Sequence, residues 1–323
     1  LPTGQTHTNP DLGQGLMAVW GSLGAHSNFS AGYTAPPHYL TAAAAAQALD
    51  FAAIADPALI TPLDDQSNLL QLPAWSWTDG EAGEAVIYSR AQLAIANQAA
   101  LFDLLAGQEL LVQWQASPLP SIAIAAMAAD DISAPASVDT LYKRWLDSGQ
   151  PFLPAGNANP DLPGAVDPAP RFTGLAVTSL DEAALLDALA AHRGWLTNAP
   201  GLWLTVQAAL DNGERYWMGS TLAPANDITL HITYGDRNGD IAGLAVWQDK
   251  APIYQFDASA PDGDWEVSLP AVPNSILYVV ATQADGDFAI TAPLRVLAGD
   301  DGVVLINEVL PAPATDNNGD GEV

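Results

Sequence analysis

The sequence predicts a mixed architecture: an α/β domain, then an immunoglobulin-like β-sandwich, then a short segment with a single strand. Three observations predict it. In residues 1–205, short apolar runs alternate with Ala- and Leu-rich stretches of helical period. In residues 206–298 the helical period is absent, and strand-like runs recur between Gly, Asp, Asn and Pro. Residues 299–323 hold one apolar run and a polar end, which is too little to fold alone.

The α/β prediction depends on strands and helices that follow one another along the chain. The expected strands are FAAIA (51–55), EAVIYS (84–89), ELLVQW (109–114) and TGLAVTSL (173–180). The expected helices are PHYLTAAAAAQALD (37–50) and LDEAALLDALAAH (180–192). We expect Thr34 or Pro36 to open the first helix, Ser179 to precede the second, and Gly194 to stop it.

The β-sandwich prediction rests on short strands at regular spacing. They are DITLHITYG (227–235), AGLAVWQD (242–249), WEVSLP (265–270), SILYVVATQ (275–283) and FAITAPLRV (288–296).

Composition excludes several classes of partner. The 323 residues include 9 Lys and Arg against 37 Asp and Glu, a net charge of −28. This charge repels phosphate backbones and anionic lipids, so we expect neither nucleic-acid binding nor membrane insertion. There is no Cys, and hence neither a disulfide nor a thiolate zinc site. The start at Leu1 and the scarcity of Lys favour a processed, secreted or cell-surface protein.

Several stretches resemble, in the same order, the motifs of one enzyme superfamily. GSLGAHSNFSAG (21–32) stands where that superfamily has Gly-Asn-Leu-His-x-His-Ser-x-x-Ser-Asp-Gly, and FAAIADPA (51–58) stands for a strand ending in Thr-Asp-His. Further similar stretches are 72–89, 109–118, 141–164 and 192–208. Together they resemble the polymerase and histidinol phosphatase (PHP) superfamily of metal-dependent phosphoesterases, in its CehA/McbA-like secreted branch. The resemblance implies a distorted (β/α)7-type PHP barrel with metal ligands at its C-terminal mouth.

Most of the ligand positions that the resemblance implies carry other residues here. These are Gly24 for a His, Ala31 for an Asp, Pro57 for a His, Ser76 for a Glu, Glu84 for a His, Ala116 or Ser117 for a His, and Asn159 and Asp161 for an Asp and a His. His26 and Asp56 alone keep the ligand's residue type. Two isolated donors do not hold a metal cluster, so we expect a pseudoenzyme with remnant positions at His26, Asp56, Glu84, Asn159 and Asp161. The alternative is one cation at His26, Asp56, Glu84 and Asp161.

Trp side chains suggest a different kind of site at the same mouth. Trp75 and Trp77 flank the Ser76 position, and Trp114 ends an expected strand. Aromatic rings at a barrel mouth stack on sugars or peptides, but Trp also commonly fills a core. Both explanations stay open at this point.

The C-terminal segment suggests assembly and calcium. Residues 303–323 resemble the start of a lamin-tail domain, a small immunoglobulin-like module. Its apolar residues are Val303, Val304, Leu305, Ile306, Val309 and Leu310. A lone apolar strand needs a sheet, so we expect it to add to a strand edge of a neighbouring copy. Asp316, Asn318 and Asp320 match half of a calcium loop, and both Ca²⁺ binding and a solvated acidic loop explain them.

These inferences lead to one expected function and two alternatives. We expect a non-catalytic, secreted or cell-surface structural protein that keeps a phosphoesterase scaffold for self-assembly into a filament or layer, or for adhesion. It would require no cofactor, and its partners would be other copies of itself or cell-surface components. The alternatives are a metal-dependent phosphoesterase with a rebuilt site and a carbohydrate- or peptide-binding module.

Overall fold

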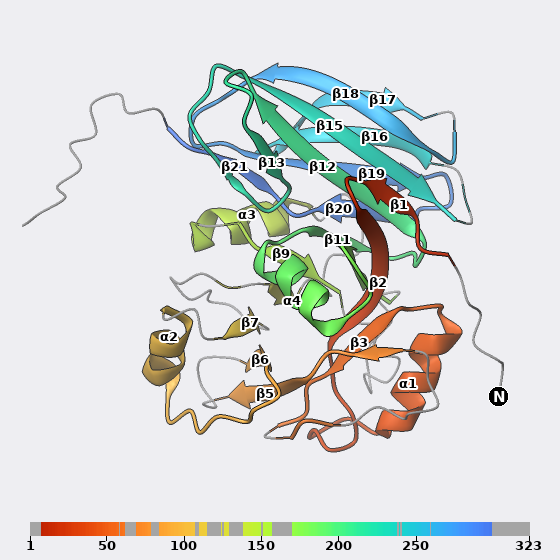
Figure 1. The fold of residues 1–323 in the computed structure, drawn as a ribbon, viewed down its shortest axis with the longest axis vertical. Coiled ribbons are helices and arrows are strands. Elements are labelled where there is room, and N and C mark those ends of the chain that lie inside the picture. Colours follow the sequence, from red (N-terminus) through yellow and green to blue (C-terminus); the bar gives the residue numbers. More distant parts are fainter. Residues whose placement is uncertain are drawn as a thin grey trace, which may run out of the picture.

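Three sheets and four helices make up the part of the chain placed by the computed structural model (Figure 1). The structure describes residues 8–57, 59–61, 69–78, 84–106, 110–114, 124, 126–128, 138–149, 151–156, 170–237, 239, 241–258 and 260–298. The longest described helix has 11 residues. No described helix is both long enough and apolar enough to be a membrane span.

The first part of the chain contains all four described helices. Its elements are β1 (Asp11–Gly13), β2 (Leu16–Ala25), α1 (Pro37–Ala46), β3 (Phe51–Ile54), β4 (Leu70–Gln71), β5 (Ala74–Thr78), β6 (Glu84–Tyr88), α2 (Gln98–Ala106), β7 (Leu111–Trp114), β8 (Ala126–Ala128), α3 (Val138–Ser148), β9 (Leu153–Ala155), β10 (Phe172–Val177), α4 (Glu182–Ala190) and β11 (Gly194–Thr197).

The second part consists of strands. They are β12 (Leu202–Leu210), β13 (Arg215–Trp217), β14 (Thr221–Leu222), β15 (Asp227–Asp236), β16 (Ile241–Gln248), β17 (Ala251–Asp257), β18 (Asp262–Pro270), β19 (Ile276–Gln283), β20 (Phe288–Thr291) and β21 (Leu294–Val296). The run 288–296, expected as one strand, forms two, β20 and β21. Pro293 lies between them and has no N–H for a ladder.

A twelve-stranded sheet runs through both parts of the chain. Its main order is β14-β21-β19-β20-β11-β10-β2-β3-β4, with β16 and β17 continuing beyond β19. The two parts join where β11 pairs with β20, so Trp195 lies opposite Thr291. The boundary expected between residues 205 and 206 falls inside β12. Hydrogen bonding is therefore continuous across the two parts.

The second part is a sandwich of two packed sheets, which lies in the upper half of Figure 1. The four-stranded sheet β13-β12-β15-β18 faces β16, β19 and β21 of the larger sheet. Every second residue of β15 is buried, as alternation on a one-sided sheet requires. The mixed α/β and β-sandwich organisation expected from the sequence is confirmed.

The strands of the first part approach a ring but do not close into a barrel within the described residues. A five-stranded sheet, β5-β6-β7-β8-β9, lies beside the β2–β3 pair. One isolated bridge joins Pro57 to Ser76, and the Leu23 N–H donates to the Gly156 carbonyl at 3.1 Å. These are single links rather than ladders, so the sheets stay separate.

The helix ends follow local chemistry. Pro36 precedes α1, as expected, and Pro37 is its first residue. Ser179 precedes α4 as expected, and the N-cap is Asp181, whose carboxylate accepts a hydrogen bond from the Ala184 N–H at 3.0 Å. The helix ends at Ala190, before the expected stop at Gly194, which instead begins β11.

Candidate functional site: a buried carboxylate held by hydroxyls

A buried carboxylate lies where strands β2 and β3 end. Because β3 runs parallel to β2, and Ala25 pairs with Ile54, the residues that follow the two strands meet at one edge of the sheet. Asp56 follows β3, and its side chain is completely buried. Residues 26–30 follow β2 and lie against it. A charge in such a place needs partners, because burying it unpaired is costly.

Four hydrogen bonds from the chain reach the Asp56 carboxylate. The Ser27 backbone N–H donates to Oδ1 at 2.8 Å, and the Ser27 hydroxyl donates to Oδ2 at 2.6 Å. The Ser30 hydroxyl donates to Oδ1 at 2.7 Å, and the Thr61 hydroxyl donates to Oδ2 at 2.6 Å. Each oxygen accepts two hydrogen bonds, which uses the roughly four lone-pair positions of a carboxylate.

His26 lies between this cluster and Glu84, the first residue of β6. Its Nδ1 is 3.2 Å from the Ser30 hydroxyl oxygen, and its Nε2 is 3.5 Å from Glu84 Oε1. Ser30 gives its one hydroxyl hydrogen to Asp56, so the contact with His26 is a hydrogen bond only if Nδ1 donates. Tyr33 covers the imidazole, with ring centroids 4.8 Å apart. In this arrangement His26 does not act as a base toward Ser30, as nucleophilic catalysis would require.

Two substituted ligand positions also lie beside Asp56. Pro57 and Ser76 form the isolated parallel bridge, and the Ser76 N–H donates to the Asp56 carbonyl at 3.1 Å. Gly24 has a φ of 75°, in the left-handed region that favours glycine. The geometry therefore brings these positions to one edge, but they carry neither an imidazole nor a carboxylate.

The described residues of this edge do not fit a divalent cation. No group of three or more His, Asp or Glu side chains suited to a metal ion occurs among them. The acceptor positions of Asp56 are filled, and His26 and Glu84 face one another. A catalytic metal needs several donors and an open position for water. Outside the described residues lie the other predicted metal positions (Asn159, Asp161, Asp316, Asn318, Asp320) and the predicted assembly strand (Val303, Val304, Leu305, Ile306, Val309, Leu310).

Sequence reasoning missed the hydroxyl groups. Ser27 and Ser30 belong to the Ser-x-x-Ser part of the motif that the first loop resembles, and that spacing was a usable signal. Thr61 had no such signal, because it comes from the segment after β3 and reaches Asp56 only through the fold.

The three Trp side chains considered for ligand binding are buried. Trp75, Trp77 and Trp114 have exposed fractions of 2%, 9% and 0%, and they pack in one apolar cluster. The Trp77 indole N–H donates to the Ile95 carbonyl at 3.2 Å. This burial favours the packing explanation over stacking on a ligand.

A second buried polar pair lies between β6 and β7. The Tyr88 hydroxyl donates to Gln113 Oε1 at 2.5 Å. Burial raises the pKa of Tyr88. The phenol therefore stays protonated near neutral pH, which suits a structural hydrogen bond and does not suit a general base.

No protein-family model and no curated protein matches this sequence. Two solved structures are similar. One is a two-domain protein containing a predicted PHP-like metal-dependent phosphoesterase from Bacteroides vulgatus, with 12% identity and a TM-score of 0.48, over 85% of this chain and 93% of that one. The other is an engineered protein, with 17% identity and a TM-score of 0.20, over 30% of this chain and 20% of that one.

Proposed function

We propose that this chain is a non-catalytic structural protein, a phosphoesterase-type scaffold that acts by assembling with other copies of itself outside the cell or at its surface. One observation carries the non-catalytic part. The Asp56 carboxylate is saturated by the Ser27 amide and by three hydroxyls, in the place where a metal enzyme would hold a cation.

The charge of the site supports the same proposal. A phosphoester is an anion, and the acidic groups of the cluster are Asp56 and Glu84, beside one imidazole. The whole chain carries a net charge of −28. Without a bound cation, these charges repel a phosphate, and the site has no metal-bound water to serve as the nucleophile.

The assembly part rests on the sequence. Residues 303–310 have the apolar composition of a strand, and a strand gains stability only by pairing. The small number of Lys and Arg argues against nucleic acid as the binding partner, because binding to a phosphate backbone needs basic side chains. A second copy of the chain supplies the sheet edges that such a segment requires.

The test combines metal analysis, turnover and microscopy on one sample of the full chain purified without chelator. We expect substoichiometric metal, no hydrolysis of a generic phosphodiester with added Zn²⁺ or Mn²⁺, and assemblies by electron microscopy at high protein concentration. Stoichiometric tightly bound metal with turnover would establish the phosphoesterase alternative. A chain that stays monomeric at every concentration and salt level would exclude self-assembly.

A further inference from the structure

In the described residues the β-sandwich has four edge strands. The edge strands β13 and β14 have only three and two residues, whereas β17 in the larger sheet and β18 in the smaller one are longer and lie on the same side of the sandwich (Figure 1). Within the described residues, β17 pairs with β16 alone and β18 with β15 alone. Each edge therefore presents a row of backbone N–H and C=O groups without a strand partner, which is a template for another strand.

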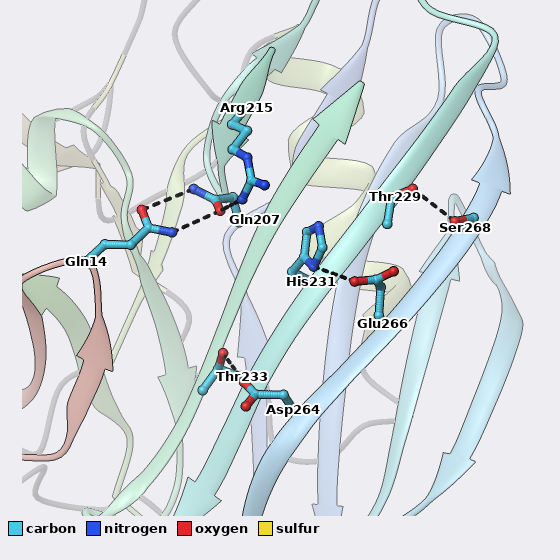
Figure 2. A network of polar contacts seen from close by, with 9 residues as sticks. All are labelled: Gln14, Gln207, Arg215, Thr229, His231, Thr233, Asp264, Glu266 and Ser268. Atoms are coloured by element: carbon cyan, nitrogen blue, oxygen red, sulfur yellow. Dashed lines mark hydrogen bonds and ion pairs between the residues drawn. The ribbon is translucent and has the colours of Figure 1, made fainter. Parts of the chain in front are cut away.

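Charged and paired side chains protect the β18 edge. Figure 2 shows three cross-strand pairs between β15 and β18 on the outer face of the smaller sheet. They are His231 with Glu266 at 2.9 Å, Thr233 with Asp264 at 2.7 Å, and Thr229 with Ser268 at 2.9 Å. Acidic side chains along an edge disfavour an added strand, since each must stay solvated.

The β17 edge has a different character. Ile253 and Tyr254 are each 38% exposed, so two neighbouring large apolar side chains of this strand lie at the surface. The pairing of β17 with β16 is regular from Tyr254 to Asp257, and its register shifts between Tyr254 and Pro252. Pro252 and the register shift at Ile253 confine the irregular part to the first three residues, and the edge is regular over residues 254–257. An exposed apolar edge of this kind is where a strand adds.

We propose that residues 303–310 of a second copy of this chain add to the free edge of β17. This inference rests on the proposed function, because it names the acceptor surface for self-assembly. The added segment gains backbone hydrogen bonds along β17, and its apolar side chains cover Ile253 and Tyr254. Residues 303–310 contain one charged residue, Glu308, so little charge is buried in the contact.

The path of the described chain favours a second copy over the same copy. β21 pairs with the start of β19. The backbone N–H of Asp249, in the turn between β16 and β17, donates to the Ile276 carbonyl, so the start of β19 lies at the same end of the sheet as the start of β17. The chain therefore leaves β21 at the end of the sheet where β17 begins. In this sheet the strands follow the order β21-β19-β16-β17. A strand added outside β17 would therefore lie four inter-strand spacings from β21, a distance of about 19 Å. The Leu297 N–H donates to the Leu222 carbonyl of β14, so the chain is still fixed at residue 297. The six steps from Leu297 to Val303 reach at most about 20 to 22 Å when fully extended. The same copy could thus reach only with a taut linker and in parallel register.

Electrostatics sets the conditions for this contact. Copies with a net charge of −28 repel one another at long range. Salt shortens that repulsion to a Debye length of about 8 Å at physiological ionic strength. Association through an apolar edge is therefore expected to strengthen with added NaCl, whereas association through ion pairs would weaken.

The absence of Cys allows a direct test on the full chain. One variant carries Gln255→Cys on β17, and another carries Asn307→Cys in the C-terminal segment. We expect the mixture to form a disulfide-linked pair of the two variants under mild oxidation, in excess over either homodimer. Adding Ile253→Lys to the acceptor is expected to weaken association at least about tenfold by sedimentation velocity. The matched control Leu180→Lys, at a 39% exposed site before α4, is expected to change nothing.

Other outcomes overturn the inference in distinguishable ways. Assemblies that persist without the mixed disulfide, or with Ile253→Lys, would leave the proposed function standing and remove β17 as the acceptor. An intrachain disulfide in a monomer carrying both cysteines would assign the segment to its own copy. Absence of both the disulfide and any association would exclude the acceptor and self-assembly together.

Discussion

Because the Asp56 carboxylate accepts four hydrogen bonds, we predict that Asp56→Asn lowers the free energy of unfolding. The change keeps the shape of the side chain but replaces one acceptor oxygen with an NH₂ group. In the native protein each oxygen accepts two hydrogen bonds, from Ser27, Ser30 and Thr61. The amide oxygen retains two acceptor positions, and the NH₂ group then points its hydrogens at groups that were donating.

The magnitude follows from the two hydrogen bonds that are lost. A hydrogen bond to a charged group contributes about 1.5 to 3 kcal/mol net, so the loss of two costs about 3 to 6 kcal/mol. If the Ser or Thr hydroxyls rotate and accept hydrogen bonds from the new NH₂ group, the loss of stability falls toward about 3 kcal/mol. Since whole domains are stable by about 5 to 15 kcal/mol, the effect is large.

The assay is urea unfolding followed by the fluorescence of the 10 Trp residues, on protein treated with chelator. Glu84→Gln is the matched control, because it makes the same chemical change in a partly exposed group 3.5 Å from His26. We expect the control to cost less than about 1 kcal/mol. A metal-ligand carboxylate would behave in the opposite way, since removing its charge stabilises a metal-free site. An Asp56→Asn protein as stable as the native one would therefore refute the reasoning.

Two further predictions concern His192 and Gly174. Burial lowers the pKa of His192 below its ordinary value of 6.5, although both ring nitrogens face backbone carbonyls. The folded state therefore binds fewer protons, and its stability is present above about pH 6.5 and lost as the pH falls. His192→Asn is expected to flatten this loss in thermal unfolding between about pH 7 and about pH 5, and an unchanged slope would contradict it. Gly174→Ala places a Cβ inside the Trp195 indole, so we expect a loss of about 1 to 3 kcal/mol or more by urea unfolding; an unaltered midpoint would contradict the packing.

Local patterns predicted the elements that local chemistry determines. The alternation of β15 and the apolar period of α4 were both readable in the sequence, because one face of each is buried. The division between residues 205 and 206 rested on the loss of the helical period, a local pattern that does not report which strands pair across it. The pairing of β11 with β20 joins residues almost a hundred positions apart, and composition carries no trace of it.

The candidate site was partly predictable for the same reason. The motif placed His26 and Asp56 at one edge, and the parallel β2–β3 pair does bring them there. The partners of Asp56 were not predicted: the Ser-x-x-Ser spacing of Ser27 and Ser30 was a signal that went unused, and Thr61 had none. Only the buried geometry distinguishes Thr61 from other hydroxyl residues of the chain.

The proposed loss of metal is difficult to reverse by one substitution, for physical reasons at three positions. A His at Gly24 would have to adopt a φ of 75°, which costs a residue with a Cβ about 1 to 2 kcal/mol. A His at Pro57 would add a donor beside a carboxylate that already accepts four hydrogen bonds. To bind a cation, Asp56 would first have to release hydroxyls that are themselves buried and would then lack acceptors. The hydroxyl cluster therefore satisfies the buried carboxylate without a metal, which is compatible with the proposed structural role.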